Sequence, residues 1–196
     1  YNALKPQKTL PIYNPADVNP ELVDSTVQYV AKYHTIADFS FTNQNGKTIT
    51  QKDYEGKIYV ADFFFTSCST ICPIMHRNMK TLFDAYKDNK DIMFLSHTID
   101  FKYDKPSVLK KYAQKLGVDV PQWQFVWGDK KEVYTLAEKD YLVAVQEDNA
   151  ATDGYVHQGW LVLIDKHKRI RGAYDGTKPE EVEKLKNDMS ILLAEK

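Results

Sequence analysis

Hydrophobic and polar residues change their spacing along this chain, and the changes predict an alternation of strands and helices. Apolar and polar side chains alternate through residues 36–42, and Asn45-Gly46 follows as a strong hairpin signal. Residues 58–65 are nearly all apolar and rich in strand-forming side chains, which is typical of a central strand buried on both faces. Residues 91–99 predict a second buried strand.

Longer segments repeat their apolar residues at the spacing of a helix. Three of them begin at or near a proline, which is favoured in the first turn: Pro73, Pro106 and Pro179. The first carries an apolar stripe of Met75, Met79, Leu82, Phe83 and Tyr86. Gly117 ends the second, and Thr177 with Glu180 predicts a capping box for the third. Shorter patterns predict a strand at 125–127, a helix at 131–139 and a closing hairpin of 160–164 with 170–174.

This order of elements predicts an α/β fold. Strand–helix–strand units favour a parallel sheet with helices on both faces, and the closing hairpin adds antiparallel strands. Residues 1–35 hold half of the eight prolines, so we expect an extended arm or linker there, with a short helix around residues 21–30. Residues 36–196 then form the folded domain.

Composition narrows the function classes. The 196 residues have a net charge of −1, with no basic cluster of the kind that binds nucleic acid. The longest apolar stretches are far shorter than the about 20 residues that span a bilayer. The chain starts at Tyr1, so we expect any membrane anchor to lie upstream of it.

Both cysteines of the chain, Cys68 and Cys72, lie at the end of the first buried strand and directly before Pro73. The proline predicts that Cys72 is the N-cap of a helix and that Cys68 lies in the preceding loop. A helix N-terminus favours negative charge, so we expect a lowered thiol pKa. The pair could be a redox-active dithiol, a soft-metal site or two structural cysteines.

A metal would need a third ligand, and His157 is the first candidate. It lies between Gly154 and Gly159 in the segment that enters the closing hairpin, which we expect to pass beside the start of the first helix. His76 is the rival, since it follows Cys72 by four residues, but its place at the edge of the apolar stripe predicts a surface position. We expect His34 to lie in the arm, His97 to be packed in or beside the second strand, and His167 to be solvated in a turn. Two thiolates and an imidazole suit copper and zinc alike.

These motifs resemble the Sco/SenC family of copper-binding assembly proteins of cytochrome c oxidase. The resemblance covers residues 36–193 and is carried by "ADFSFTNQNGKTIT", "CSTICP", "TIDFKYDKPSVLKKYAQKLG", "WQFVWG" and "VHQGWLVLIDKHKRIRGAYDG". It implies a thioredoxin-like fold, with a central mixed sheet, helices on both faces and an added N-terminal β-hairpin. It also implies a copper ion, Cu(I) or Cu(II), held by Cys68, Cys72 and His157.

The resemblance further implies a partner and a location. The partner would be the copper-bearing subunit of cytochrome c oxidase or another copper protein, which receives copper or has its thiols kept reduced. The location would be extracytoplasmic, in the periplasm, with a membrane tether upstream of Tyr1. An acidic residue of the family falls near Asp100 or Asp104. The family commonly has Asp directly before the histidine, whereas this chain has Val156 there and Asp153 as the nearest acid.

An enzymatic function is the alternative. In a thiol–disulfide oxidoreductase or a peroxidase-like redoxin, Cys68 would attack as the more exposed thiol and Cys72 would resolve the mixed disulfide. The cysteine spacing is one residue longer than the usual C-x-x-C, and such an enzyme has no need of His157. Stoichiometric copper uptake would favour the copper protein, and turnover of a disulfide substrate would favour the enzyme.

Overall fold

The computed structural model describes residues 9–147, 155–157 and 159–195. Its strands are β1 Ser40–Asn43, β2 Thr48–Thr50, β3 Ile58–Phe64, β4 Ile92–Thr98, β5 Trp123–Trp127, β6 Val145–Glu147, β7 Tyr155–His157, β8 Trp160–Ile164 and β9 Ile170–Asp175. Its helices are α1 Ile71–Tyr86, α2 Pro106–Lys115, α3 Lys130–Thr135, which continues as one π-helical turn over Leu136–Asp140, and α4 Pro179–Ala194. None of the helices within the described ranges is both long enough and apolar enough to span a membrane.

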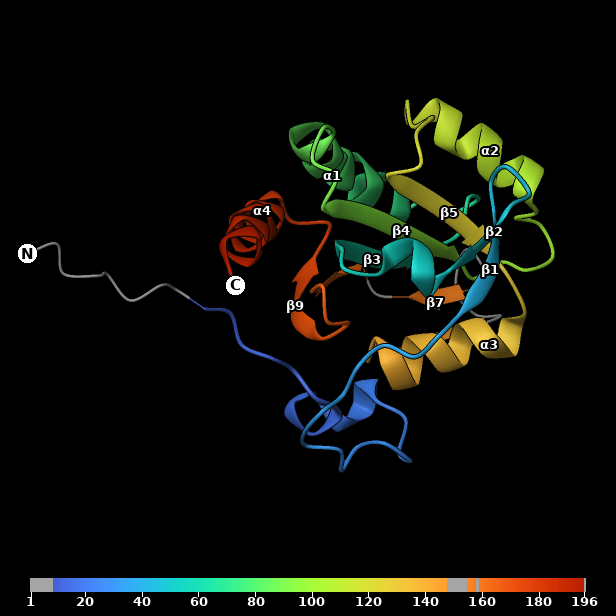
Figure 1. The fold of residues 1–196 in the computed structure, drawn as a ribbon. Helices are drawn as coiled ribbons and strands as arrows, with labels where there is room; N and C mark the ends of the chain where they lie inside the picture. The colour runs from blue at the N-terminus through green and yellow to red at the C-terminus, as the bar shows by residue number, and fades with distance from the viewer. Residues whose placement is uncertain (1–8, 148–154, 158, 196) are drawn as a thin grey trace, which may run out of the picture.

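Seven of the strands form one mixed sheet in the order β2-β1-β5-β4-β3-β8-β9. β3 pairs in parallel with β4, and β4 with β5, while β8, β9 and the β1–β2 hairpin pair antiparallel. Helices α1, α2 and α4 cover one face, and α3 lies on the other face with the N-terminal segment (Figure 1). The structure therefore confirms the predicted mixed sheet with helices on both faces and an added hairpin.

β3 lies inside this sheet, between β4 and β8, and all seven of its residues are buried. The apolar stripe of α1 packs against it, which places the Met75 and Met79 side chains in the core at 0% exposure. Gly176, directly after β9, packs so closely against α1 that a Cβ there would lie 2.7 Å from Met75 Cγ. These contacts fix the start of α1 against both β3 and the closing hairpin.

Two local predictions are wrong because nearby side chains make other hydrogen bonds. Lys178, not Thr177, is the N-cap of α4, and the Thr177 hydroxyl donates to Asp175 Oδ1 at 2.6 Å instead of capping the helix. In the arm, the backbone N–H and hydroxyl of Thr26 donate to Asp24 Oδ1 in a turn that competes with a helix. The segment forms two 3-10 turns, Pro15–Asp17 and Pro20–Leu22.

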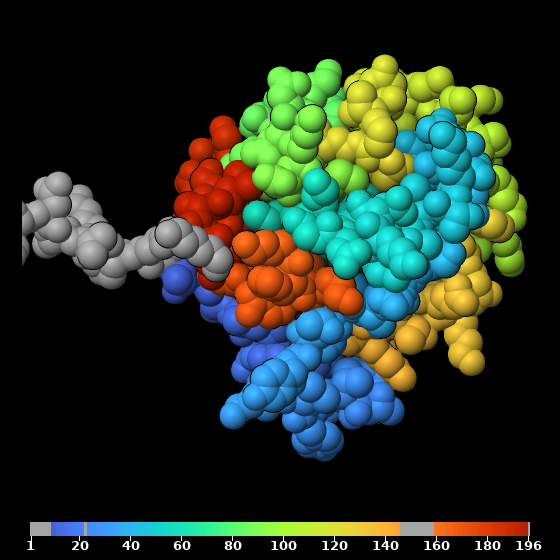
Figure 2. Space-filling model, viewed as in Figure 1, coloured from blue at the N-terminus to red at the C-terminus, as the bar shows by residue number. Residues whose placement is uncertain are grey.

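The N-terminal segment packs on the β8–β9 hairpin. Its blue atoms lie directly against the orange hairpin in the space-filling view (Figure 2). Tyr13 forms a backbone bridge to Ile170, and the N–H of Ile36 donates to the carbonyl of Lys168 at 2.9 Å. The described part of the arm thus covers the outer edge of β9, where the sheet would otherwise expose its last strand.

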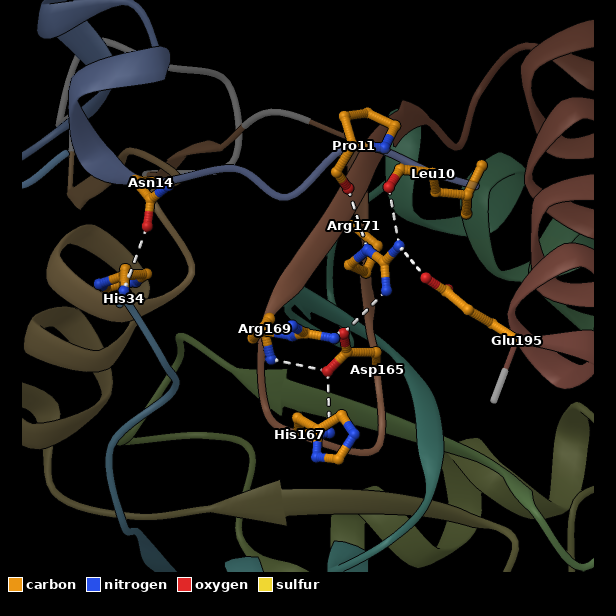
Figure 3. A network of polar contacts seen from close by, with 9 residues as sticks. All are labelled: Leu10, Pro11, Asn14, His34, Asp165, His167, Arg169, Arg171 and Glu195. Carbon is orange, nitrogen blue, oxygen red and sulfur yellow. Dashed lines mark hydrogen bonds and ion pairs between the residues drawn. The ribbon is translucent and has the colours of Figure 1, made fainter. Parts of the chain in front are cut away.

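Arg171 holds this segment through a buried charge network (Figure 3). The guanidinium donates to the carbonyls of Leu10 and Pro11 at 2.7 and 3.0 Å. It also forms ion pairs with Asp165 at 3.0 Å and Glu195 at 2.8 Å. Burial alone would lower the pKa of Arg171, but these two carboxylates raise it. Because removal of one partner from a buried ion pair costs several kcal/mol, the arm, the hairpin turn and the end of α4 depend on one another.

His97 in β4 is packed in the core, as predicted, among aromatic rings on the α3 face. Its ring stacks on Phe63 at 4.8 Å and meets Phe41 and Tyr141 edge-on, both at 5.6 Å. Nδ1 donates to the Asp62 carbonyl at 3.3 Å, and Nε2 has no hydrogen-bond partner among the described residues. Burial lowers the pKa of His97 to about 4, so the ring is neutral at physiological pH.

This buried histidine predicts a pH-dependent loss of stability. The unfolded chain takes up a proton on His97 near pH 6.5, whereas the fold resists it until about pH 4, so the stability held above pH 6.5 falls as the pH drops towards 4. When the pH falls from 8 to 5, protonation of His97 in the unfolded chain should lower the free energy of unfolding by about 2 kcal/mol. His97→Phe keeps an aromatic ring in the stack and should remove that part of the loss, as measured by urea unfolding at both pH values. Equal losses in both proteins would show that His97 does not contribute.

Candidate functional site

The two cysteines lie where β3 passes into α1. β3 ends at Phe64, Cys68 follows in the loop as predicted, and Cys72 is the second residue of α1. The predicted N-cap position of Cys72 is wrong, because Thr70 is the N-cap and Pro73 is the third helical residue. The proline fits there since the first four N–H groups of a helix have no partner within the helix.

Both cysteines are present as buried thiols rather than as a disulfide. Cys68 is 6% exposed and Cys72 is 1% exposed, so Cys68 is the more accessible of the two. The backbone N–H of Cys72 donates to Cys68 Sγ at 3.4 Å, and Thr70 Oγ1 lies 3.6 Å from the same sulfur. The helix N-terminus therefore directs its amide towards the sulfur of Cys68, the slightly more exposed cysteine.

The expected lowering of the thiol pKa is wrong for Cys72. Burial raises the pKa of this thiol, and its hydrogen bond with Cys68 adds to the effect. A backbone hydrogen bond from Phe65 works in the opposite direction without reversing the shift. Burial has the larger effect on the pKa of Cys72. The backbone N–H of Cys72 donates to Cys68 Sγ, so it does not stabilise a thiolate on Cys72.

Asp104 ties the cysteine loop to the end of β4. Its carboxylate accepts the backbone N–H of Thr66 at 2.9 Å, the Thr66 hydroxyl and the Thr98 hydroxyl at 2.6 Å. Asp100, the other candidate acid, caps its own turn by accepting the N–H of Tyr103 at 3.1 Å. Burial raises the pKa of Asp104, while the hydrogen bonds from Thr66 and Thr98 lower it. Asp104 thus holds the loop two residues before Cys68.

The backbone of His157 lies in β7, which pairs with β6 so that His157 is opposite Val145. This short ribbon was not predicted, because strands of three residues carry too little pattern to be recognised. Gly159 follows two residues later, and a Cβ there would lie 3.7 Å from Ile71 Cδ1 at the start of α1. The segment therefore passes beside the first helix. The His157 side chain and Asp153 lie outside the described residues, so the ligand role stays a prediction.

The predicted surface position of His76 is wrong. Its ring is fully buried, with Nε2 2.6 Å from Asp62 Oδ2 and Nδ1 2.7 Å from the Tyr112 hydroxyl. Both ring nitrogens are thereby occupied, which excludes His76 as a ligand in this arrangement. His34 bonds to the carbonyl of Asp140 in the α3 region, and His167 lies exposed in the hairpin turn as predicted. In the described parts of the chain no three histidine, cysteine or acidic side chains converge on one point.

Sequence reasoning missed Asp62, which lies buried behind the cysteines. The signal was present, because Asp62 is the single charged residue in an otherwise apolar strand. A charge in such a strand must face a partner in the core, since an isolated buried charge is very costly. Its partner is His76, the histidine that helical periodicity placed at the surface.

Fold and site together define a class. A mixed sheet, with a dithiol between the buried parallel strand β3 and the helix α1 that follows it, is the arrangement of a thioredoxin-like protein. The sequence model of the SCO1/SenC family matches residues 27–191, and the chain belongs to this family.

Solved structures agree with this assignment. A SCO1/SenC family lipoprotein from Bacillus anthracis str. Ames superimposes with a TM-score of 0.75 at 32% identity, over 82% of this chain and 95% of that one. BsSco is described as a member of the Sco family of cytochrome c oxidase assembly proteins with a disulfide switch. It superimposes with a TM-score of 0.73 at 28% identity, over 83% of this chain and 95% of that one. Bradyrhizobium japonicum ScoI, solved with copper bound, superimposes with a TM-score of 0.64 at 24% identity, over 79% of this chain and 99% of that one. At this identity the match shows a shared fold.

Proposed function

We propose that this protein is a copper-binding assembly factor for the copper centre of cytochrome c oxidase, with Cys68, Cys72 and His157 as the copper ligands. It would deliver copper to its partner or keep the thiols of that partner reduced. The observation that carries the proposal is the meeting of two segments, where Gly159 packs on Ile71 at the start of the helix that bears Cys72. This contact places the residue two positions after His157 beside the start of α1, and it supports a ligand role for His157 although 85 residues separate it from Cys72 (157 − 72 = 85).

The residues present fit a soft metal ion. Two thiolates and one imidazole are ligands that Cu(I) accepts, and that Cu(II) accepts with a further weak ligand. Both thiols must lose their protons when the metal binds, so metal entry is coupled to proton release. The copper-bound Bradyrhizobium japonicum ScoI supports copper over zinc for this fold. Asp104 would keep the Cys68 loop in place while the sulfurs exchange protons for metal.

Copper binding should depend on the redox state of the cysteines. The reduced protein should bind a single copper ion per chain, and the disulfide form should bind none, because a disulfide offers no thiolate. The measurement is metal content after gel filtration of the reduced and the oxidised protein, with absorption recorded in the thiolate-to-copper charge-transfer region. Equal copper content in the two forms would contradict a dithiolate site.

His157→Ala should leave the fold intact and weaken copper binding by more than about tenfold, with a changed charge-transfer spectrum. The reason is that the site would lose its nitrogen ligand while both thiolates remain. His167→Ala is the matched control, because His167 is exposed in the β8–β9 turn. Competition with a copper chelator measures both variants. If His157→Ala binds as tightly as the control and the protein turns over disulfide substrates, the oxidoreductase alternative takes over.

We also propose that residues 1–35 join the domain to a membrane tether outside the cytoplasm, in the periplasm, where the copper-bearing subunit of the oxidase would be the partner. The likeness to the Bacillus anthracis family lipoprotein supports a tether. A protease added to intact spheroplasts should then digest the full-length protein. Protection until the cells are lysed would contradict this location.

A further inference from the structure

A chain of buried hydrogen bonds crosses the core behind the cysteines. Asp62 is fully buried, and its Oδ1 accepts the Ser96 hydroxyl at 2.5 Å while its Oδ2 lies 2.6 Å from His76 Nε2. Ser96 Oγ accepts the indole N–H of Trp123 at 2.9 Å. His76 Nδ1 bonds to the Tyr112 hydroxyl at 2.7 Å. The chain therefore joins the three parallel strands to α1 and α2.

This network is a costly way to fill a core. Buried polar groups, even when they are paired, are often no more stabilising than apolar residues of the same volume, because they must leave water when the chain folds. The surrounding positions are aromatic, with Phe64 and Trp123 rings 4.7 and 5.7 Å from the His76 ring, so an apolar filling would suit them. Stability alone gives no reason for the polar pair, which favours a role at the neighbouring site.

The network ends beside the cysteines. His76 follows Cys72 by four residues and lies on the same side of α1, one turn further along the helix. Burial raises the pKa of the Tyr112 phenol, and the charges of Cys72, Asp62 and Cys68 raise it further, which agrees with a hydroxyl close to the dithiol. Of the five residues in this hydrogen-bond network, only Tyr112 is partly exposed.

We propose that Asp62, His76 and Tyr112 are positioning residues for the cysteine pair, and that they stabilise the dithiol over the disulfide. The inference deepens the proposed function, since it rests on Cys68 and Cys72 being a redox pair. In the dithiol the Cys72 amide donates to Cys68 Sγ. A disulfide needs the two sulfurs at about 2.05 Å, so Cys68 and Cys72 must move closer together than they are as free thiols. His76, fixed on both ring nitrogens, resists that movement.

The glutathione equilibrium tests this on the whole chain without copper. Two glutathione thiols give two electrons and two protons to the protein disulfide, whose S–S bond breaks as glutathione disulfide forms. Tyr112→Phe keeps the ring and removes the hydroxyl that fixes His76 Nδ1. It should shift the equilibrium about tenfold towards the protein disulfide, equal to about 30 mV in reduction potential. Alkylation of the remaining thiols and mass spectrometry give the ratio, and Asp62→Asn should shift it in the same direction.

Tyr86→Phe is the matched control. Tyr86 lies at the other end of α1, where its hydroxyl bonds to the Lys186 carbonyl at 3.0 Å and to Ser190 Oγ at 2.8 Å. Its loss should lower the melting temperature and leave the glutathione equilibrium unchanged. If Tyr112→Phe and Asp62→Asn lower the melting temperature but keep the wild-type equilibrium, the network is structural and the proposal is wrong.

The two proposals fail in different ways. Wild-type protein that binds no copper would overturn the copper site and leave a shifted glutathione equilibrium in Tyr112→Phe as support for the network. Wild-type protein that forms no Cys68–Cys72 disulfide at any glutathione ratio would overturn the redox pair and this inference with it. An equal shift in Tyr86→Phe and Tyr112→Phe would also overturn it, because a loss of helix packing would then explain both.

Discussion

The complete burial of β3 is the constraint on which the rest of the structure depends. A strand with all seven residues buried needs hydrogen-bonded neighbours on both edges and cover on both faces. β4 and β8 supply the edges, α1 packs on one face, and the aromatic cluster around His97 fills the other. Because the chain leaves this strand directly into the cysteine loop, the dithiol lies at the carboxyl end of β3, and α/β sheets commonly place their sites at the carboxyl ends of their strands.

Burial also decides the chemistry of the thiols. The start of a helix favours a thiolate, but Cys72 lies deep enough for desolvation to outweigh that effect, and its own amide serves Cys68. Both cysteines are buried, and Cys68 is slightly more exposed than Cys72. Cys72 therefore keeps its proton at neutral pH, and a metal ion that binds to this sulfur must displace it.

Polar groups secure the site from two sides. In front, Asp104 gathers Thr66 and Thr98 and so fixes the loop that leads to Cys68. Behind, Asp62 and His76 tie the first turns of α1 to the sheet. A separate network around Arg171 fixes the N-terminal segment to the far edge of the sheet and to the end of α4. Each network satisfies its buried polar groups with hydrogen bonds, as the low dielectric of a protein interior requires.

The sequence by itself determined the periodic elements and the chemistry at their ends. The apolar runs of β3 and β4, the proline-led helices and the cysteine pair at one strand end could all be recognised, because local pattern and local sterics specify them. Contacts between distant residues depend on how the elements pack, and only the tertiary structure decided them. It buried His76 against Asp62, placed Cys72 inside the helix with a raised pKa, and brought the strand of His157 to the start of α1. Helical spacing says which residues share a side of α1, but the width of the covered face depends on α2 and the sheet, whose positions no local pattern contains.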